Sequence, residues 1–195
     1  MRTNAFAEIR LDVPGWVDGF VRAGPRRYRT AEDRVRLAID LSHLGMEHGG
    51  GPFGAAVFER RSGRLVAPGV NWVVGGGCSL WHAEIVAVAL AQKVVGHYDL
   101  GAAGAGDYEL ASSTEPCAMC LGAIPWSGLR SLLCGARGAD ALRVGFDEGA
   151  KPAGWVRAFK ARGLAVQRDI CRAEAVTVLR EYRDRGGVIY SARKG

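Results

Sequence analysis

The sequence contains no hydrophobic run long enough to cross a membrane, and its N-terminal region has no apolar core of the kind that directs secretion. A spanning helix needs about 20 mostly apolar residues, and a signal peptide needs an apolar core of about 7–15 residues. The opening stretch MRTNAFAE carries an early acid instead. We therefore expect a cytoplasmic protein with no membrane partner.

The chain contains only five cysteines, which is an odd number. An odd count, no visible secretion signal and a chain that is not small all argue against a disulfide framework. The close pair Cys117 and Cys120 is more typical of metal ligands. We expect the other cysteines to be small buried apolar residues: Cys78, Cys134 and Cys171.

The chain also lacks the signatures of a nucleotide-phosphate loop and of a nucleic-acid-binding module. Its glycine triplets at 49–51 and 75–77 have no following Lys-Ser/Thr. The net charge is +6, and arginine gathers near 22–36 and 180–194. A basic patch can bind nucleic acid, but acids interrupt both stretches and no aromatic or glycine pattern accompanies them. We expect a solvated surface, without a nucleic-acid partner.

What the chain does contain is the pattern of one α/β domain over residues 30–195. A length of 195 residues suits a single domain. Strands that alternate with helices indicate an α/β sandwich with a largely parallel portion after an opening hairpin. Proline and glycine at 14–15 and 24–25 predict an irregular leader over 1–29. We expect the leader to pack on the domain through apolar residues: Phe6, Ile9, Trp16 and Phe20.

The helices and strands of the domain are predicted from hydrophobic periodicity and from turn residues. A capping pattern at Thr30–Asp33 starts the first helix, which ends before the glycines at 49–51. The helix over 82–95 has almost no polar face, so we expect it to be buried. Further helices are predicted over 117–126, 155–162 and 171–182, strands over 53–59, 65–74, 108–113, 130–135 and 164–168, and an irregular segment over 136–150.

Two short motifs supply the residues of a catalytic zinc site: His82-Ala83-Glu84 and Pro116-Cys117-Ala118-Met119-Cys120. Catalytic zinc takes three protein ligands and keeps a fourth position for water. Cys117 and Cys120 are three residues apart, so they share one face of a helix. A helix N-terminus favours the thiolate that binds the metal. We therefore predict Zn²⁺ held by His82, Cys117 and Cys120.

Glu84 is the residue that makes this zinc site catalytic. Zinc lowers the pKa of a bound water from 15.7 to about 7. Glu84 is not needed as a ligand, so it is free to carry the water proton to a ring nitrogen. The pair H-x-E and P-C-x-x-C is the signature described for zinc nucleobase deaminases. A structural zinc site with Cys78 or Cys134 as a fourth ligand is the alternative, which the joint presence of Glu84 and Pro116 disfavours.

With these motifs the sequence resembles the cytidine deaminase superfamily over roughly residues 30–195, and within it the bacterial guanine deaminase branch. More particularly, it resembles the guanine deaminases of this fold that also accept ammeline, a triazine. The resemblance is carried by the zinc motifs and by these further stretches: Gly50–Gly54, Asn71, Glu115–Ala123, Trp126, Gly145–Glu148 and Gly187–Tyr190.

The resemblance implies a three-layer α/β/α sandwich with a mixed five-stranded sheet. It also implies a homodimer in which exchanged C-terminal segments close the neighbouring subunit's pocket. By the same resemblance, Asn71 hydrogen-bonds the base, while Phe53, Trp126 and Phe146 pack against it and Tyr190 approaches from the C-terminal segment. Packing roles for the aromatic residues and a turn-capping role for Asn71 stay open as alternatives.

The chemistry of guanine deamination requires a second acid besides Glu84. Hydrolytic attack at C2 needs a proton at a ring nitrogen and another on the leaving amine. The resemblance places the second proton carrier in the segment 146–148. We favour Glu148, with Asp147 as the alternative.

The predicted function is zinc-dependent hydrolytic deamination of guanine to xanthine and ammonia, extending to ammeline or related amino-heterocycles. A tRNA adenosine deaminase is the first alternative, because it shares both zinc motifs. A guanosine or cytidine deaminase is the second. A zinc-binding protein without turnover is the third, and Glu84 argues against it.

Overall fold

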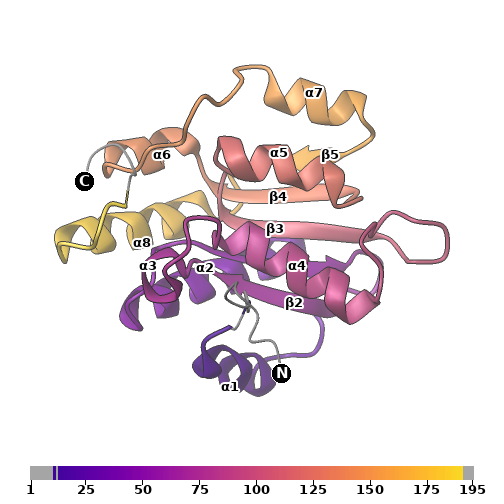
Figure 1. Ribbon diagram of the computed structural model, residues 1–195, viewed down its shortest axis with the longest axis horizontal. Helices are drawn as coiled ribbons and strands as arrows, with labels where there is room; N and C mark the ends of the chain where they lie inside the picture. The colour runs from indigo at the N-terminus through magenta and orange to yellow at the C-terminus, as the bar shows by residue number, and fades with distance from the viewer. Residues whose placement is uncertain (1–10, 12, 191–195) are drawn as a thin grey trace, which may run out of the picture.

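The computed structural model describes residue 11 and residues 13–190, and these form a mixed five-stranded sheet between layers of helices. The strand order is β2-β1-β3-β4-β5, with β1 antiparallel to both β2 and β3, and β3, β4 and β5 parallel (Figure 1). The predicted mixed sheet is confirmed. The strands are β1 (Gly54–Glu59), β2 (Leu65–Val70), β3 (Tyr108–Thr114), β4 (Ser131–Ala136) and β5 (Ala165–Gln167).

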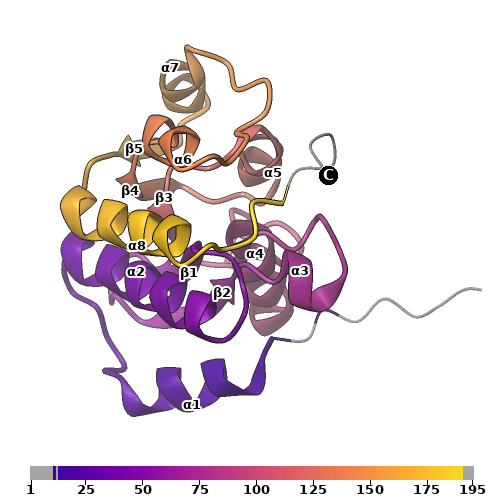
Figure 2. The ribbon, with the colours of Figure 1, turned by 90° about the vertical axis from the view of Figure 1, so that its left-hand side faces the viewer.

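Helices cover both faces of the sheet. Helices α2 (Ala31–Glu47) and α8 (Arg172–Asp184) lie side by side on one face, and α4 (Ala83–Val95) and α5 (Ala118–Trp126) lie on the other (Figure 2). Each face has its own apolar core, one centred on α2 and α8 and the other on α4 and α5. The remaining helices are α1 (Gly15–Ala23), α3 (Val73–Gly76), α6 (Gly138–Arg143) and α7 (Trp155–Ala161).

Two strand glycines let the helices approach the sheet closely. A Cβ at Gly54 on β1 would lie 2.2 Å from the carbonyl oxygen of Ala38 in α2. A Cβ at Gly69 on β2 would lie 2.2 Å from the carbonyl oxygen of Ala83 in α4. Heavy atoms cannot approach this closely, so a side chain at either position would push the helix outwards. Gly69 therefore sets the position of the first turn of α4.

The prediction of an irregular leader over 1–29 is wrong for residues 15–23, which form α1. Pro14 occupies the N-cap of this helix and Gly24 its C-cap, so the proline and glycine mark its ends. Trp16 and Phe20 are partly buried against the core, as predicted. Phe6 and Ile9, the other predicted contacts, lie outside the described residues.

The prediction of an irregular segment over 136–150 is wrong at its start, where α6 forms. The Asp140 carboxylate accepts a hydrogen bond from the backbone N–H of Arg137 at 2.9 Å and so caps the first turn. Six residues are too few for the helical period to stand out in the sequence. From Val144 onwards the segment is irregular, as predicted.

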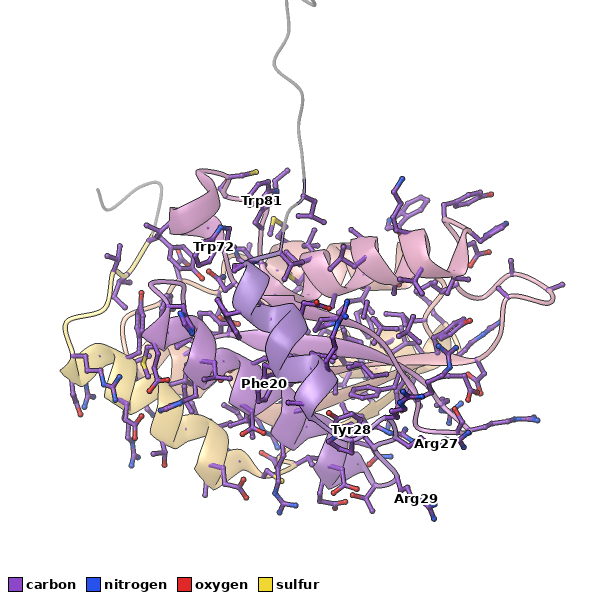
Figure 3. The ribbon with its side chains drawn as sticks, turned by 90° about the horizontal axis from the view of Figure 1, so that it is seen from below. Phe20, Arg27, Tyr28, Arg29, Trp72 and Trp81 are labelled. Atoms are coloured by element: carbon purple, nitrogen blue, oxygen red, sulfur yellow. The ribbon has the colours of Figure 1, made fainter. Side chains whose placement is uncertain are left out.

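The predicted strand over 65–74 ends early, at Val70, and the short helix α3 follows it. The indole rings of Trp72 and Trp81 lie together beside α3 (Figure 3), and the backbone N–H of Trp72 donates to the carbonyl of Trp81 at 3.0 Å. A Cβ at Gly76 would lie 2.0 Å from the Trp81 ring. The glycines therefore make room for these rings in a turn of helix.

Helix α4 is buried along one face only, so the expectation that all of it is buried is wrong. Ala83, Ala87 and Ala91 face the sheet and are fully buried. On the outer side Val94 is 63% exposed, and Val88 and Leu90 are half-buried. Among the described residues, no helix combines the length and apolar character needed to cross a membrane.

Candidate active site

The three predicted zinc ligands come together where α4 and α5 begin. His82 is the N-cap of α4, Cys117 is the N-cap of α5, and Cys120 lies in the first turn of α5. Sγ of Cys117 lies 3.4 Å from Nδ1 of His82, and Sγ of Cys120 lies 3.7 Å from the same nitrogen. A tetrahedral zinc ion with bonds of about 2.3 Å to sulfur and 2.0 Å to nitrogen separates these atoms by roughly 3.5 Å. The donor set therefore fits zinc.

The sulfur of Cys117 is held in the ionised form that binds a metal. Hydrogen bonds from Cys120 and His82 overcome burial and lower the pKa of Cys117 to about 4, so its sulfur is a thiolate. Burial opposes a charge on His82, but its hydrogen bond with Cys117 raises the pKa of the imidazole. The start of α5 adds a favourable dipole for the anionic sulfur. Zinc binds the ionised form of cysteine and the neutral form of histidine, so its binding is coupled to the release of protons from these groups.

Glu84 lies two residues into α4 and directs its carboxylate at the same group. Its side chain is buried, and Oε2 accepts a hydrogen bond from Sγ of Cys120 at 3.5 Å. Oε1 lies 3.4 Å from the hydroxyl of Ser112 on β3. Burial, together with the nearby Cys117 thiolate, raises the pKa of Glu84. A carboxyl group with a raised pKa, next to a metal site, is suited to accept and release a proton.

The segment 146–148 lines the same cavity and brings both candidate acids, Asp147 and Glu148, to its wall. The carbonyl oxygen of Glu148 accepts a hydrogen bond from the backbone N–H of Ala118 at 2.9 Å, which fixes the segment to the start of α5. Glu148 is buried, and burial raises its pKa to about 7 against the opposing effect of Lys151. Asp147 is exposed, and its carboxylate accepts a hydrogen bond from the N–H of Gly149 at 2.8 Å.

Aromatic rings and one buried amide complete the pocket. The rings of Phe53 and Phe146 meet edge to face at 4.7 Å between centroids, and those of Phe146 and Tyr190 do so at 5.4 Å. The side-chain amide of Asn71 donates to the hydroxyl of Tyr190 at 2.6 Å. A Cβ at Gly51 would lie 2.7 Å from Oδ1 of Asn71, so only glycine leaves room for this amide. All four pocket side chains line one cavity with His82, Glu84 and Glu148.

Residues 29–136, more than half of the chain, match the family model described as the cytidine and deoxycytidylate deaminase zinc-binding region. The chain belongs to the cytidine and deoxycytidylate deaminase family. The family's matched segment contains His82, Cys117 and Cys120, which are the described residues that form a possible metal site. The predicted zinc cofactor and the predicted zinc-dependent aminohydrolase activity are both confirmed at this level.

Individual deaminases resemble this chain over most of its length. The solved guanine deaminase of Nitrosomonas europaea is 42% identical, with a TM-score of 0.87 over 91% of this chain and 97% of that one. A solved complex with 2,6-diaminopurine is 46% identical, with a TM-score of 0.85 over 94% of this chain and 98% of the other. The guanine deaminase of Bacillus subtilis strain 168 is 38% identical over 118 residues, 60% of this chain and 71% of the relative.

One predicted site residue of this deaminase lies elsewhere than expected. Trp126 was predicted in the substrate pocket, but it is 86% exposed at the end of α5 and does not line the cavity. The nine residues of α5 carry it away from Cys117. Tyr190, which was predicted to approach the base from the C-terminal segment, does line the cavity. In this structure it lies over the pocket of its own chain, because the segment after α8 returns across the ends of β1 and β2 to Asn71.

The sequence motifs of the deaminase missed three residues around the pocket. Glu115 is buried and lines the cavity, and it accepts a hydrogen bond from the N–H of Gly138 at 3.0 Å. Lys151 lies between Glu115 and Glu148. The hydroxyl of Ser112 lies next to Glu84. Glu115 could have been found, because it directly precedes the P-C-x-x-C motif. No local pattern in the sequence indicates Lys151 or Ser112.

Proposed function

We propose that this protein catalyses the hydrolytic deamination of guanine to xanthine and ammonia, and that it also acts on ammeline or related amino-heterocycles. The observation that carries the proposal is one pocket that places the Glu84 carboxylate beside the three zinc ligands and Glu148 across from them. The similarity to guanine deaminases over more than nine-tenths of the chain supports guanine as the substrate.

When bound, the zinc ion supplies a water molecule whose pKa is lowered to about 7. Glu84 accepts a proton from the attacking water and delivers it to a ring nitrogen next to C2. Its buried position keeps this carboxylate close to the reacting atoms and away from bulk water. General acid–base help of this kind contributes about 10²–10⁴ in rate.

Glu148 is the second proton carrier in this proposal. Water first adds at C2. The C–N bond to the amino group then breaks as the new hydroxyl becomes a carbonyl and gives up its proton, and the nitrogen must leave as neutral ammonia. Glu148 protonates that nitrogen, since its pKa of about 7 lets it give and take a proton near neutral pH. Asp147 serves less well, because it is exposed and its carboxylate is engaged by Gly149.

Asn71, Phe53, Phe146 and Tyr190 bind the base in this proposal. The amide of Asn71 hydrogen-bonds the ring, in part by exchanging its contact with the Tyr190 hydroxyl for one with substrate. The rings of Phe53 and Phe146 enclose a flat heterocycle by offset and edge-to-face contacts. Tyr190 covers the pocket from the C-terminal side.

The alternatives with larger substrates fit less well. The ring of Tyr190 covers the predicted base site, which leaves little space for the ribose of a nucleoside or the backbone of RNA. Many basic side chains of the surface also have acidic partners, including Arg22 with Asp18 and Arg36 with Glu174. A paired basic surface does not need phosphate to balance its charge, which argues against a tRNA adenosine deaminase.

We also propose that the protein is a homodimer. Three large apolar side chains lie exposed on and near α4 and α5: Leu80 at 56%, Val94 at 63% and Trp126 at 86%. Large apolar side chains that are this exposed are candidates for burial against a partner. A second copy of the chain is the partner that the resemblance implies.

A substrate panel with ammonia detection tests the proposal. Zinc-loaded protein is assayed with guanine, ammeline, guanosine, cytidine, cytosine and an anticodon stem-loop RNA. We expect ammonia from guanine and the triazine, and at most a trace from the nucleosides and the RNA. Release from the RNA alone would establish the tRNA deaminase instead, and release from none would favour a zinc-binding protein without turnover.

A further inference from the structure

We propose that Lys151 is a positioning residue for Glu148, which it holds toward the pocket by bridging the Glu148 and Glu115 carboxylates. This inference rests on the proposed function, because it assigns to Lys151 a role in the proton transfer made by Glu148. Lys151 belongs to no motif of the sequence, and it does not line the reactive pocket itself.

The bridge is symmetric and largely shielded from water. Nζ of Lys151 lies 3.4 Å from Oε2 of Glu148 and 3.4 Å from Oε2 of Glu115. The side chains are 14% exposed for Lys151, 9% for Glu148 and 6% for Glu115. Ion pairs in such surroundings are screened far less than those on a surface.

Glu115 provides a fixed anchor at the far end of the bridge. Its Oε2 accepts a hydrogen bond from the N–H of Gly138, and its Oε1 accepts one from Nε of Arg168. Nζ of Lys151 also lies 5.5 Å from the centre of the Trp155 ring, within the range of a cation–π contact. Glu115 and Trp155 therefore hold the ammonium group independently of Glu148, so Lys151 can constrain the Glu148 carboxylate.

Gly138 keeps the space that the bridge needs. A Cβ at this position would lie 2.8 Å from Nζ of Lys151 and 3.1 Å from Oε2 of Glu148. Gly138 opens α6, where alanine has a higher helix propensity than glycine by about 1 kcal/mol. Its lack of a side chain is therefore explained by the neighbouring ammonium and carboxylate groups, and not by the needs of the helix.

The bridge also bears on the protonation of Glu148. Burial raises the pKa of Glu148, Lys151 opposes that effect, and the charges of Cys117 and Glu84 add to it. Loss of the ammonium group would leave Glu148 buried beside other acids without its cationic partner. A carboxyl group in that setting would be both less ionised and less well oriented.

The test compares kcat, KM and zinc content in Lys151→Met, Lys151→Arg and the wild type, with guanine as substrate. We expect Lys151→Met to lower kcat by about 10–100-fold, the size typical for partners that orient a reacting group. KM and zinc content should stay within about threefold of wild type, and Lys151→Arg should restore part of kcat. Lys160→Met is the matched control, because Lys160 is exposed on α7 and has no contact with Glu148.

A second pair of variants shows whether Lys151 acts through Glu148. In a Glu148→Gln background, Lys151→Met should cause no further loss beyond about twofold. Gly138→Ala should lower kcat although Lys151 is intact, which keeps the test decisive where Lys151→Met does not fold. The inference is overturned if Lys151→Met has the kcat of the wild type. It is also overturned if the fold-loss in kcat of the double variant equals the product of the losses of the two single variants. In both cases the proposal of guanine deamination stands. Absence of ammonia release by the wild type rejects the proposed function instead.

Discussion

At the scale of single residues, Glu84 is the group on which the proposed chemistry depends most. Glu84→Ala removes the proton carrier but leaves His82, Cys117 and Cys120 in place. We expect this variant to bind one zinc ion per chain and to have a kcat about 10²–10⁴-fold lower than that of the wild type. Metal analysis and ammonia release measure the two effects separately. Glu32→Ala is the control, because Glu32 is an exposed acid of α2. Activity of Glu84→Ala within tenfold of wild type would refute the role of Glu84 as proton carrier.

The two neighbouring acids at 147 and 148 give a second prediction at this scale. Glu148 is buried against the site, whereas Asp147 is exposed and accepts a backbone hydrogen bond. Glu148→Gln should therefore reduce kcat by at least tenfold more than Asp147→Asn does. Both variants should fold, as checked by thermal unfolding. The opposite order of activities would transfer the second proton transfer to Asp147.

Residues close in sequence were predicted more reliably than contacts between distant segments. His82 and Glu84, and likewise Cys117 and Cys120, are short motifs at helix starts, so local geometry directs each pair to one site. Trp126 illustrates the limit, since the direction of a residue at the end of α5 depends on where that helix packs. The Glu148–Lys151–Glu115 bridge depends on three-dimensional packing of the segment after α6, which no sequence pattern specifies.

At the scale of elements, Gly69 on β2 determines where α4 places His82 and Glu84. Gly69→Ala introduces a Cβ 2.2 Å from the carbonyl oxygen of Ala83, so α4 must shift outwards. We expect a loss of about 1–3 kcal/mol in unfolding free energy, the usual cost of overpacking, and weaker zinc binding. Chemical denaturation and zinc titration measure these effects.

The control for this prediction is Gly19→Ala in α1. A Cβ at Gly19 would have no atom within 4 Å, and alanine favours the helix. This variant should be at least as stable as wild type and should bind zinc normally. Unchanged stability and zinc affinity in Gly69→Ala would show that the close approach of α4 to β2 does not position the ligands.

Long helices and central strands were predicted from periodicity, and short elements were not. Helix α2 has a full apolar face and a capping box at Thr30 and Asp33, and the structure contains both. Helix α1 was missed because proline and glycine at its ends were interpreted as breaks, and α6 was missed because six residues are too few to show the helical period. Helix α3 holds only four residues, and its glycines are explained by the rings of Trp72 and Trp81, which local sequence does not reveal.

At the scale of the whole molecule, the outer faces of α4 and α5 predict a homodimer. Light scattering of the purified protein should give a mass twice the 20.8 kDa of one chain. Trp126→Asp should shift the protein toward monomer, because it replaces the most exposed of the apolar side chains on these faces with a charge. A variant with Tyr98→Asp, also exposed at 79%, tests how far the interface extends. A wild-type monomer at micromolar concentration would contradict the dimer.

The α/β class of the whole molecule was predicted from the alternation of strands and helices. The number of strands and the three layers were predicted from the resemblance. The exchange of C-terminal segments between subunits stays a prediction, because contacts within one chain do not test it. A single sequence contains no information on whether a C-terminal segment turns back onto its own chain or crosses to a partner. The hydrogen bond between Asn71 and Tyr190 within one chain is a three-dimensional result.

The measurement that tests the central claim most directly follows guanine, xanthine and ammonia together in one reaction. Zinc-loaded protein should convert guanine to xanthine with one ammonia released per xanthine formed. Activity should disappear after zinc is removed with a chelator and should return when one zinc ion per chain is restored. Xanthine formation that is unaffected by zinc removal, or no xanthine from guanine under any zinc loading, would contradict the account.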